Sequence, residues 1–204
     1  PTAGGVGQLS VEYEMYDLLA VYPLIDGDNT DVQSMDNTLT LPRYADGVGV
    51  KAVLVNHVAP AITTGCATVI DYIDADNVSR STTVYATTFG AGKSAWSLNA
   101  GGTSTGALYL PMSGRGIKSI SALTFTTAPG GLWAIYLVRP IQRINWRGGA
   151  AGVTQTVFTE KDISGQDSFN FPTIEDGAHL GFFYLPNGSA RSVATFGTAT
   201  FIWG

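Results

Sequence analysis

The stretch that decides the fold runs from Gly116 to Ile141 and reads GIKSISALTFTTAPGGLWAIYLVRPI. It holds two runs of apolar, β-branched and aromatic residues, 117–127 and 132–138, with a Pro-Gly-Gly turn between them. Short runs bounded by turn residues are typical of strands, and we expect these two to form a hairpin. The second run, LWAIYLV, is apolar on both faces, which predicts a central strand that is covered on each side.

Similar short runs recur on both sides of this stretch, separated by clusters of Gly, Asn, Asp and Pro. They lie at 37–44, 50–58, 67–73, 80–85, 179–185 and 194–203. The Ala75-Asp76-Asn77 turn predicts a hairpin between 67–73 and 80–85, whereas Val11–Tyr22 fits either a strand or a helix. We therefore expect an all-β fold, an antiparallel β-sandwich of jelly-roll type with roughly ten strands. We divide the chain into an extended N-terminal arm, residues 1–10, and a single β-sandwich domain, residues 11–204.

Both ends of the chain are expected to contact other subunits. The first residues are rich in glycine, which loses much backbone freedom when it becomes ordered, so we expect a neighbour to hold Pro1, Thr2 and Val6. The run 194–203 has no charge and no proline, and as a free sheet edge it would pair with other chains. We therefore expect Phe201 and Trp203 to lie in a subunit contact.

Charge is scarce in this chain. Only 13% of residues are Asp, Glu, Lys or Arg, about half the usual share, and the net charge is −5. Interface cores are depleted of charged residues, so this composition favours a surface that neighbours cover. The chain has no basic run and no apolar stretch of about 18 residues, and we expect it to bind neither nucleic acid nor membrane. It starts without a signal peptide, which favours synthesis in a cytoplasm without export.

Several residues could carry chemistry, but none forms a complete motif. Gly90-Ala91-Gly92-Lys93-Ser94 is similar to a phosphate-binding loop, yet Thr87 stands where that motif needs its first glycine. The aspartates 26, 28 and 31 have the spacing of an incomplete calcium loop, and side-chain-stabilised turns are the simpler interpretation.

The remaining candidates for chemistry are two histidines and one cysteine. His57 and His179 could form a metal site or a catalytic dyad only together, and nothing in the sequence pairs them. Cys66 is most simply a packed thiol. We expect no enzymatic activity, no metal and no cofactor.

Part of the sequence resembles a family of small virion-associated proteins of tailed bacteriophages. The similar residues are YPLIDGDNTDVQSMDNTLTLPRYADGVGV (22–50), the stretch 116–141 and the closing PNG…W (186–203). This resemblance implies a jelly-roll protein that decorates a capsid and is located in the virion.

The corresponding function is a capsid decoration (cement) protein that binds the major capsid protein, with a homotrimer as the expected assembly. The first alternative is a tail-associated or receptor- or glycan-binding adhesion module, because four tryptophans and nine tyrosines could line a sugar-binding face. A carbohydrate-active enzyme on a jelly roll would need paired carboxylates in a cleft, and the sequence shows no such pair.

Overall fold

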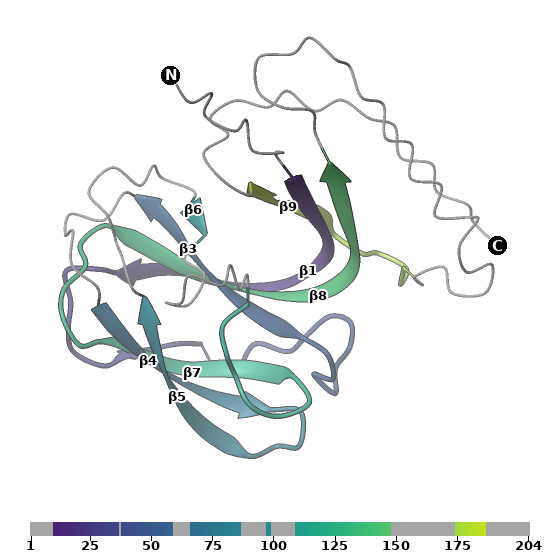
Figure 1. Cartoon of the computed structure of the whole chain (residues 1–204). Coiled ribbons are helices and arrows are strands. Elements are labelled where there is room, and N and C mark those ends of the chain that lie inside the picture. Colours follow the sequence, from purple (N-terminus) through teal and green to yellow (C-terminus); the bar gives the residue numbers. More distant parts are fainter. Residues whose placement is uncertain are drawn as a thin grey trace, which may run out of the picture. The chain divides into compact units, whose positions relative to one another are not determined.

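The computed structural model describes residues 10–36, 38–58, 66–86, 97–98, 109–147 and 174–186. In these residues every regular element is a β-strand, so the all-β class is confirmed (Figure 1). The segment Val11–Tyr22, whose pattern fitted either a strand or a helix, belongs to the first strand. The described residues contain no helix long and apolar enough to cross a membrane.

The strands form two antiparallel sheets. The first sheet has the order β6-β3-β8-β1-β9, and the second has the order β2-β7-β4-β5. The strand bounds are β1 (Ser10–Asp26), β2 (Gln33–Ser34), β3 (Lys51–Val58), β4 (Cys66–Asp74), β5 (Ser79–Ala86), β6 (Ser97–Leu98), β7 (Ile117–Phe125), β8 (Leu132–Arg147) and β9 (Leu180–Pro186).

The chain divides into two compact units. The larger unit comprises Met15–Gln142 and Pro172–Gly181, and the other comprises Pro1–Glu14, Arg143–Phe171 and Phe182–Gly204. The contacts reported below lie within the larger unit. The N-terminal arm stays a prediction, because of its residues 1–10 the structure describes Ser10 alone, and the single sandwich domain stays a prediction as well.

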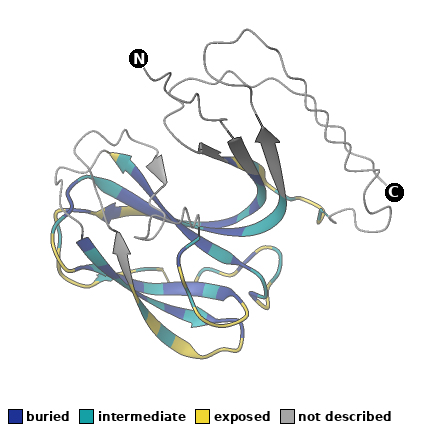
Figure 2. Ribbon diagram, in the orientation of Figure 1, coloured by how far each residue is buried: buried dark blue, intermediate teal, exposed yellow. Residues whose placement is uncertain are grey.

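The core of the larger unit lies where its two sheets share apolar side chains (Figure 2). Along β4 buried and half-buried residues alternate, as expected for a strand with one face on a core. Along β8 Trp133, Ala134, Ile135, Leu137 and Val138 are all buried, and β8 lies between β3 and β1. The expected central strand is therefore confirmed.

The hairpin expected between 67–73 and 80–85 is also confirmed, because β4 pairs with β5 in one unbroken register. Its turn is held by the carboxylate of Asp74, whose Oδ1 accepts hydrogen bonds from the backbone of Asp76 (2.8 Å) and Val78 (2.9 Å). Asn77 adopts a φ of 61°, which asparagine tolerates better than most residues. Local turn chemistry thus determines this connection.

The hairpin expected between 117–127 and 132–138 is wrong. β7 pairs with β4 and β2, whereas β8 belongs to the other sheet and pairs with β3, so the Pro-Gly-Gly segment crosses between the sheets. Gly27 fixes this crossing, since its N–H donates to Gly131 (2.9 Å) and its carbonyl accepts from Gly130 (2.9 Å). The Phe125 and Trp133 rings, one from each strand, lie 6.0 Å apart in the core. Each strand thus contributes one aromatic ring to the core between the sheets.

The strand expected at 37–44 is not present either, because the described residues 38–44 have no strand pairing. Leu41 is buried, and Leu39 packs against the same core. The two leucines therefore have the apolar role that their spacing suggested. Their backbone is a loop, and the groups that hold this loop are described next.

Candidate interaction surface

The five contact residues expected at the chain ends, Pro1, Thr2, Val6, Phe201 and Trp203, lie outside the described residues. The same is true of the incomplete phosphate-binding loop at 90–94. The structure therefore does not test these expectations. A candidate site has to be built from the larger unit, starting with its charged groups.

The loop after Leu41 is fastened to β1 by a buried ion pair. Arg43 Nε and Nη2 each donate to a carboxylate oxygen of Asp17 at 2.7 Å, and Nη2 also reaches the carbonyl of Leu18 at 3.2 Å. The Asp17 side chain is fully buried, and it also accepts the backbone N–H of His179 at 2.8 Å. Hydrogen bonding to Asp17 raises the pKa of Arg43 further above its usual value. This pair therefore joins three segments of the chain.

A second contact holds the same loop from β8. The guanidinium of Arg139 lies 5.2 Å from the ring centre of Tyr44 and donates to the Val48 carbonyl at 2.8 Å. Gly49 has a φ of 72°, and a Cβ at this position would lie 1.3 Å from Arg139 Nη1. Burial raises the pKa of Tyr44. Arg43, Tyr44 and Gly49 of this loop therefore have a structural role.

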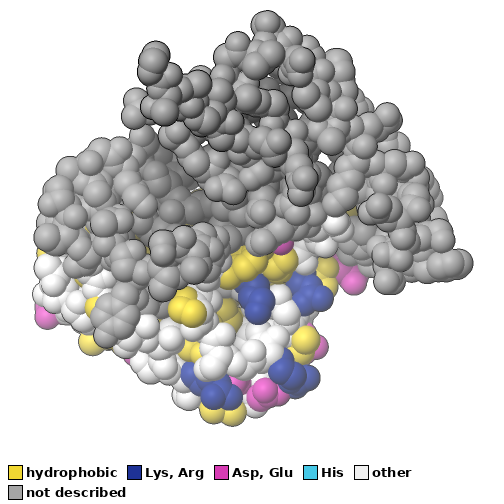
Figure 3. Space-filling model, viewed as in Figure 1, with side chains coloured by type: hydrophobic (Ala, Val, Ile, Leu, Met, Phe, Trp, Pro, Cys, Tyr) yellow, Lys and Arg dark blue, Asp and Glu magenta, His cyan; other side chains and the backbone are white. Residues whose placement is uncertain are grey.

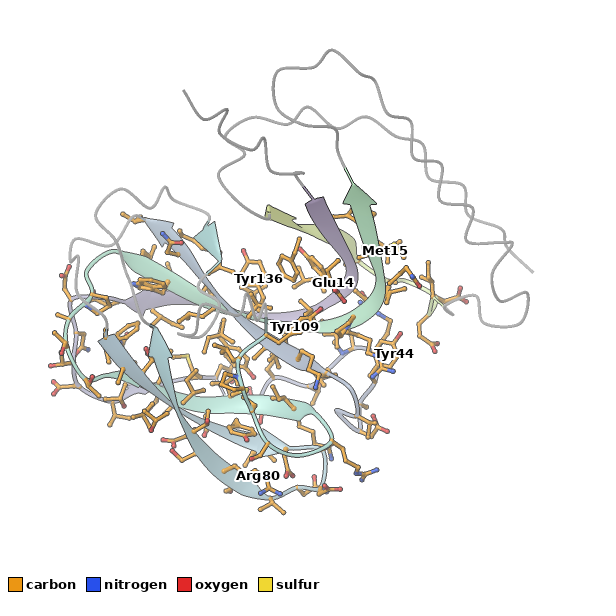
Figure 4. The ribbon with its side chains drawn as sticks, viewed as in Figure 1. Glu14, Met15, Tyr44, Arg80, Tyr109 and Tyr136 are labelled. Atoms are coloured by element: carbon orange, nitrogen blue, oxygen red, sulfur yellow. The ribbon has the colours of Figure 1, made fainter. Side chains whose placement is uncertain are left out.

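Two ion pairs at the β4–β5 turn are structural as well. Asp74 pairs with Arg80 beside the β4–β5 turn, and the exposed Asp76 pairs with Arg115. Figure 4 shows Arg80 near this turn, well away from Tyr44. On the face seen in Figure 3, most of the described surface is uncharged.

The two histidines and the cysteine each bond to a different partner. His57 Nε2 lies 3.2 Å from the Tyr136 hydroxyl, whereas His179 is exposed and bonds to Asp17 through its backbone. The Cys66 thiol is buried and donates to the carbonyl of Thr127 at 2.8 Å, which confirms the packed thiol. Within the described residues no group of three or more His, Cys, Asp or Glu side chains could hold a metal ion.

The acidic loop that follows β1 is built from side-chain-stabilised turns, as expected. Asp26 Oδ1 accepts from the N–H of Asp28 (2.9 Å), and Asn29 Oδ1 accepts from the N–H of Asp31 (2.8 Å). The amide of Gln33 bonds to both backbone groups of Asp26, at 2.8 Å each, and so closes the loop. These bonds hold residues 26 and 33 side by side.

Just before this loop, β1 breaks its alternation and exposes two residues in succession. Tyr22 and Ile25 are buried, but Pro23 and Leu24 between them both face solvent. Leu24 is 75% exposed and has a φ of 61°, a conformation that bulky L-residues rarely adopt. Val32, in the closed loop that follows, is 65% exposed.

A groove of about 260 Å³ is lined by Pro23, the residue before Leu24 in the chain. One wall is the end of β1, and the other is β2 with the residues that follow it. The lining residues are Val21, Tyr22, Pro23, Ser34, Met35, Asp36 and Leu39. The groove therefore exposes both apolar and polar groups, and one of the polar groups is the carboxylate of Asp36.

The sequence contained a signal for this surface that we did not use. The letters VYPLID place a proline inside an apolar run, and a proline there disfavours an interior strand. This indicates an irregular strand end, although it does not say which side chain would face solvent. The left-handed conformation of Leu24 is apparent only in the structure.

Comparisons with models of protein families, with curated proteins and with solved structures find no match to this chain. The function must therefore be argued from the residues themselves. The described part offers structural ion pairs, a groove with a partly apolar lining, and exposed apolar side chains next to an acidic loop.

Proposed function

We propose that this protein is a structural component of a tailed-bacteriophage virion, a capsid decoration protein that stabilises the head by binding the major capsid protein. The proposal includes jelly-roll connectivity, a homotrimeric assembly, synthesis in the host cytoplasm and the absence of any catalytic activity. It is supported by the sequence resemblance, the low charge and the all-β fold.

One observation carries the proposal: within the described residues, charged groups are used to hold loops, while large apolar side chains are left on the surface. The buried Asp17 and the buried Asp74 each bind an arginine and backbone N–H groups of neighbouring segments. Leu24 and Val32, in contrast, are exposed by 75% and 65%. An enzyme of this size would be expected to place perturbed ionisable groups together in a cleft, whereas a packing protein needs apolar contact area.

The test is the number of copies in a purified particle. Virions are separated by denaturing gel electrophoresis, and the band of this protein is quantified against that of the major capsid protein. A ratio close to that of the major capsid protein, together with trimers in analytical ultracentrifugation, is the expected result. A few copies per particle would indicate the tail-associated adhesion module instead, and absence from the particle would refute both.

A further inference from the structure

Leu24 combines two features that each cost stability. A leucine in the left-handed region is sterically strained, and glycine or asparagine would fit the observed φ of 61° better. Its side chain also has 75% of its surface in water, so the folded chain gains little from it. The fold does not explain why this position holds a leucine, and strained residues that the fold does not need are often functional.

The groove that Pro23 lines has the size for side chains of a protein rather than for a small molecule. Its volume of about 260 Å³ is below the range of about 300–1,000 Å³ that is usual for small-molecule sites. Val21, Pro23, Met35 and Leu39 supply the apolar part of its lining, next to Ser34 and Asp36. An apolar side chain of a partner, inserted beside Leu24, would bury apolar area on both molecules.

The charge around the groove indicates what else the partner carries. Asp26, Asp28, Asp31 and Asp36 are all exposed, and none of them is in an ion pair within the described residues. The first 42 residues of the chain contain no Lys or Arg, and Arg43 is bound to Asp17. Asp36 lines the groove, Asp26 ends its β1 wall, and Asp28 and Asp31 lie in the loop that follows, so a basic partner is complementary to these carboxylates.

We infer that this surface docks a partner-protein segment that inserts an apolar side chain next to Lys or Arg. We call it the Leu24 surface; it consists of Val21, Pro23, Leu24, Val32, Met35 and Leu39, with the carboxylates of Asp26, Asp28, Asp31 and Asp36. The inference goes beyond the proposed function, since it names the surface and the chemistry of its partner, and it applies to a partner in the head or in the tail.

The experiment uses the full chain and three short fluorescent peptides of equal length. The first peptide alternates Lys with Val, the second alternates Lys with Ser, and the third alternates Glu with Val. In fluorescence anisotropy we expect the Lys-Val peptide to bind about tenfold more tightly than either of the others, and its affinity to fall with added salt. Equal binding of the two Lys peptides would mean non-specific attraction to an acidic protein and would overturn the inference.

Leu24→Gly separates docking from folding. Glycine relieves the strain, so the midpoint of thermal unfolding should stay the same or rise, while affinity for the Lys-Val peptide should fall about tenfold, as expected for an anchor residue. Leu24→Asn, which also tolerates this φ, is the second variant if the glycine variant unfolds. Val78→Ala is the matched control, because Val78 is also exposed but lies in the β4–β5 turn.

Unchanged peptide affinity in folded Leu24→Gly or Leu24→Asn would refute the docking role of Leu24. The gel measurement on virions does not depend on this result. The docking surface and the proposed virion function can therefore fail separately.

Discussion

The carboxylate of Asp17 is fully buried, and it binds groups from two other segments of the chain. Arg43→Ala removes both of the 2.7 Å hydrogen bonds from the guanidinium, and among the described residues the backbone N–H of His179, at 2.8 Å, is the donor that stays. A buried charge that loses its partner typically destabilises a protein by about 3–5 kcal/mol. Because domains are stable by only about 5–15 kcal/mol, this single change should remove a large share of the stability.

Two further variants separate this explanation from simple loss of a side chain. Arg115→Ala breaks the Asp76 pair, whose side chains are 65% and 41% exposed, and should change the stability little because water screens exposed pairs. The double variant Asp17→Asn with Arg43→Met removes the buried charge but keeps an acceptor for the N–H of His179. The free energy of unfolding of this double variant should therefore be closer to the wild-type value than that of Arg43→Ala.

The assay is urea denaturation, followed by tryptophan fluorescence and extrapolated to water. The expected order of stability is wild type and Arg115→Ala, then the double variant, then Arg43→Ala. If Arg43→Ala loses no more stability than Arg115→Ala, the carboxylate of Asp17 must bind water or another partner instead. The proposed joining role of this pair would then be wrong.

Three other outcomes are expected. The N–H of Val78, followed by the guanidinium of Arg80, holds the pKa of Asp74 below its usual value. The stability that Asp74 contributes is therefore present above the ordinary carboxyl pKa and is lost as the pH falls through the lowered one, so Asp74→Asn should flatten the acid side of a pH–stability curve. In Gly27→Ala the new Cβ would lie 2.1 Å from the Gly130 carbonyl oxygen, and urea denaturation should show a free energy of unfolding lower by more than about 2 kcal/mol. Gly177→Ala is the control: a Cβ there has open space around it, so the free energy of unfolding should fall by only about 1 kcal/mol, because of the φ of 73°. Trp203→Ala should weaken self-association by a few kcal/mol in analytical ultracentrifugation, and an unchanged oligomer would exclude this residue from the contact.

The sequence predicted the connections that depend on local chemistry. In the β4–β5 hairpin one aspartate and one asparagine determine the turn, and both are visible in the sequence as Asp74 and Asn77. The central position of β8 was predictable for a similar reason, because a run that is apolar on both faces needs cover on both sides. Each inference used information contained within a few residues.

The prediction failed where distant partners decide the structure. A Pro-Gly-Gly segment can turn a chain within one sheet or carry it between two sheets, and its own residues do not distinguish these outcomes. Here the choice depends on Gly27, about a hundred residues earlier in the chain, which bonds to Gly130 and Gly131. The loop at 38–44 was misassigned for a related reason, since Arg43 is fixed by Asp17 rather than by a strand neighbour.

The residues from Tyr22 to Val50, which carry the resemblance, have two different physical explanations. Arg43, Tyr44 and Gly49 are explained by the fold, because each makes a contact that holds the loop to a sheet. Leu24 is not, because a smaller or more polar residue would satisfy its backbone and its solvent exposure at lower cost. Folding therefore explains Arg43, Tyr44 and Gly49, and we propose that binding explains Leu24. The same stretch contains the acidic loop, so an apolar anchor and the charges that would orient a basic partner occur within a few residues of each other.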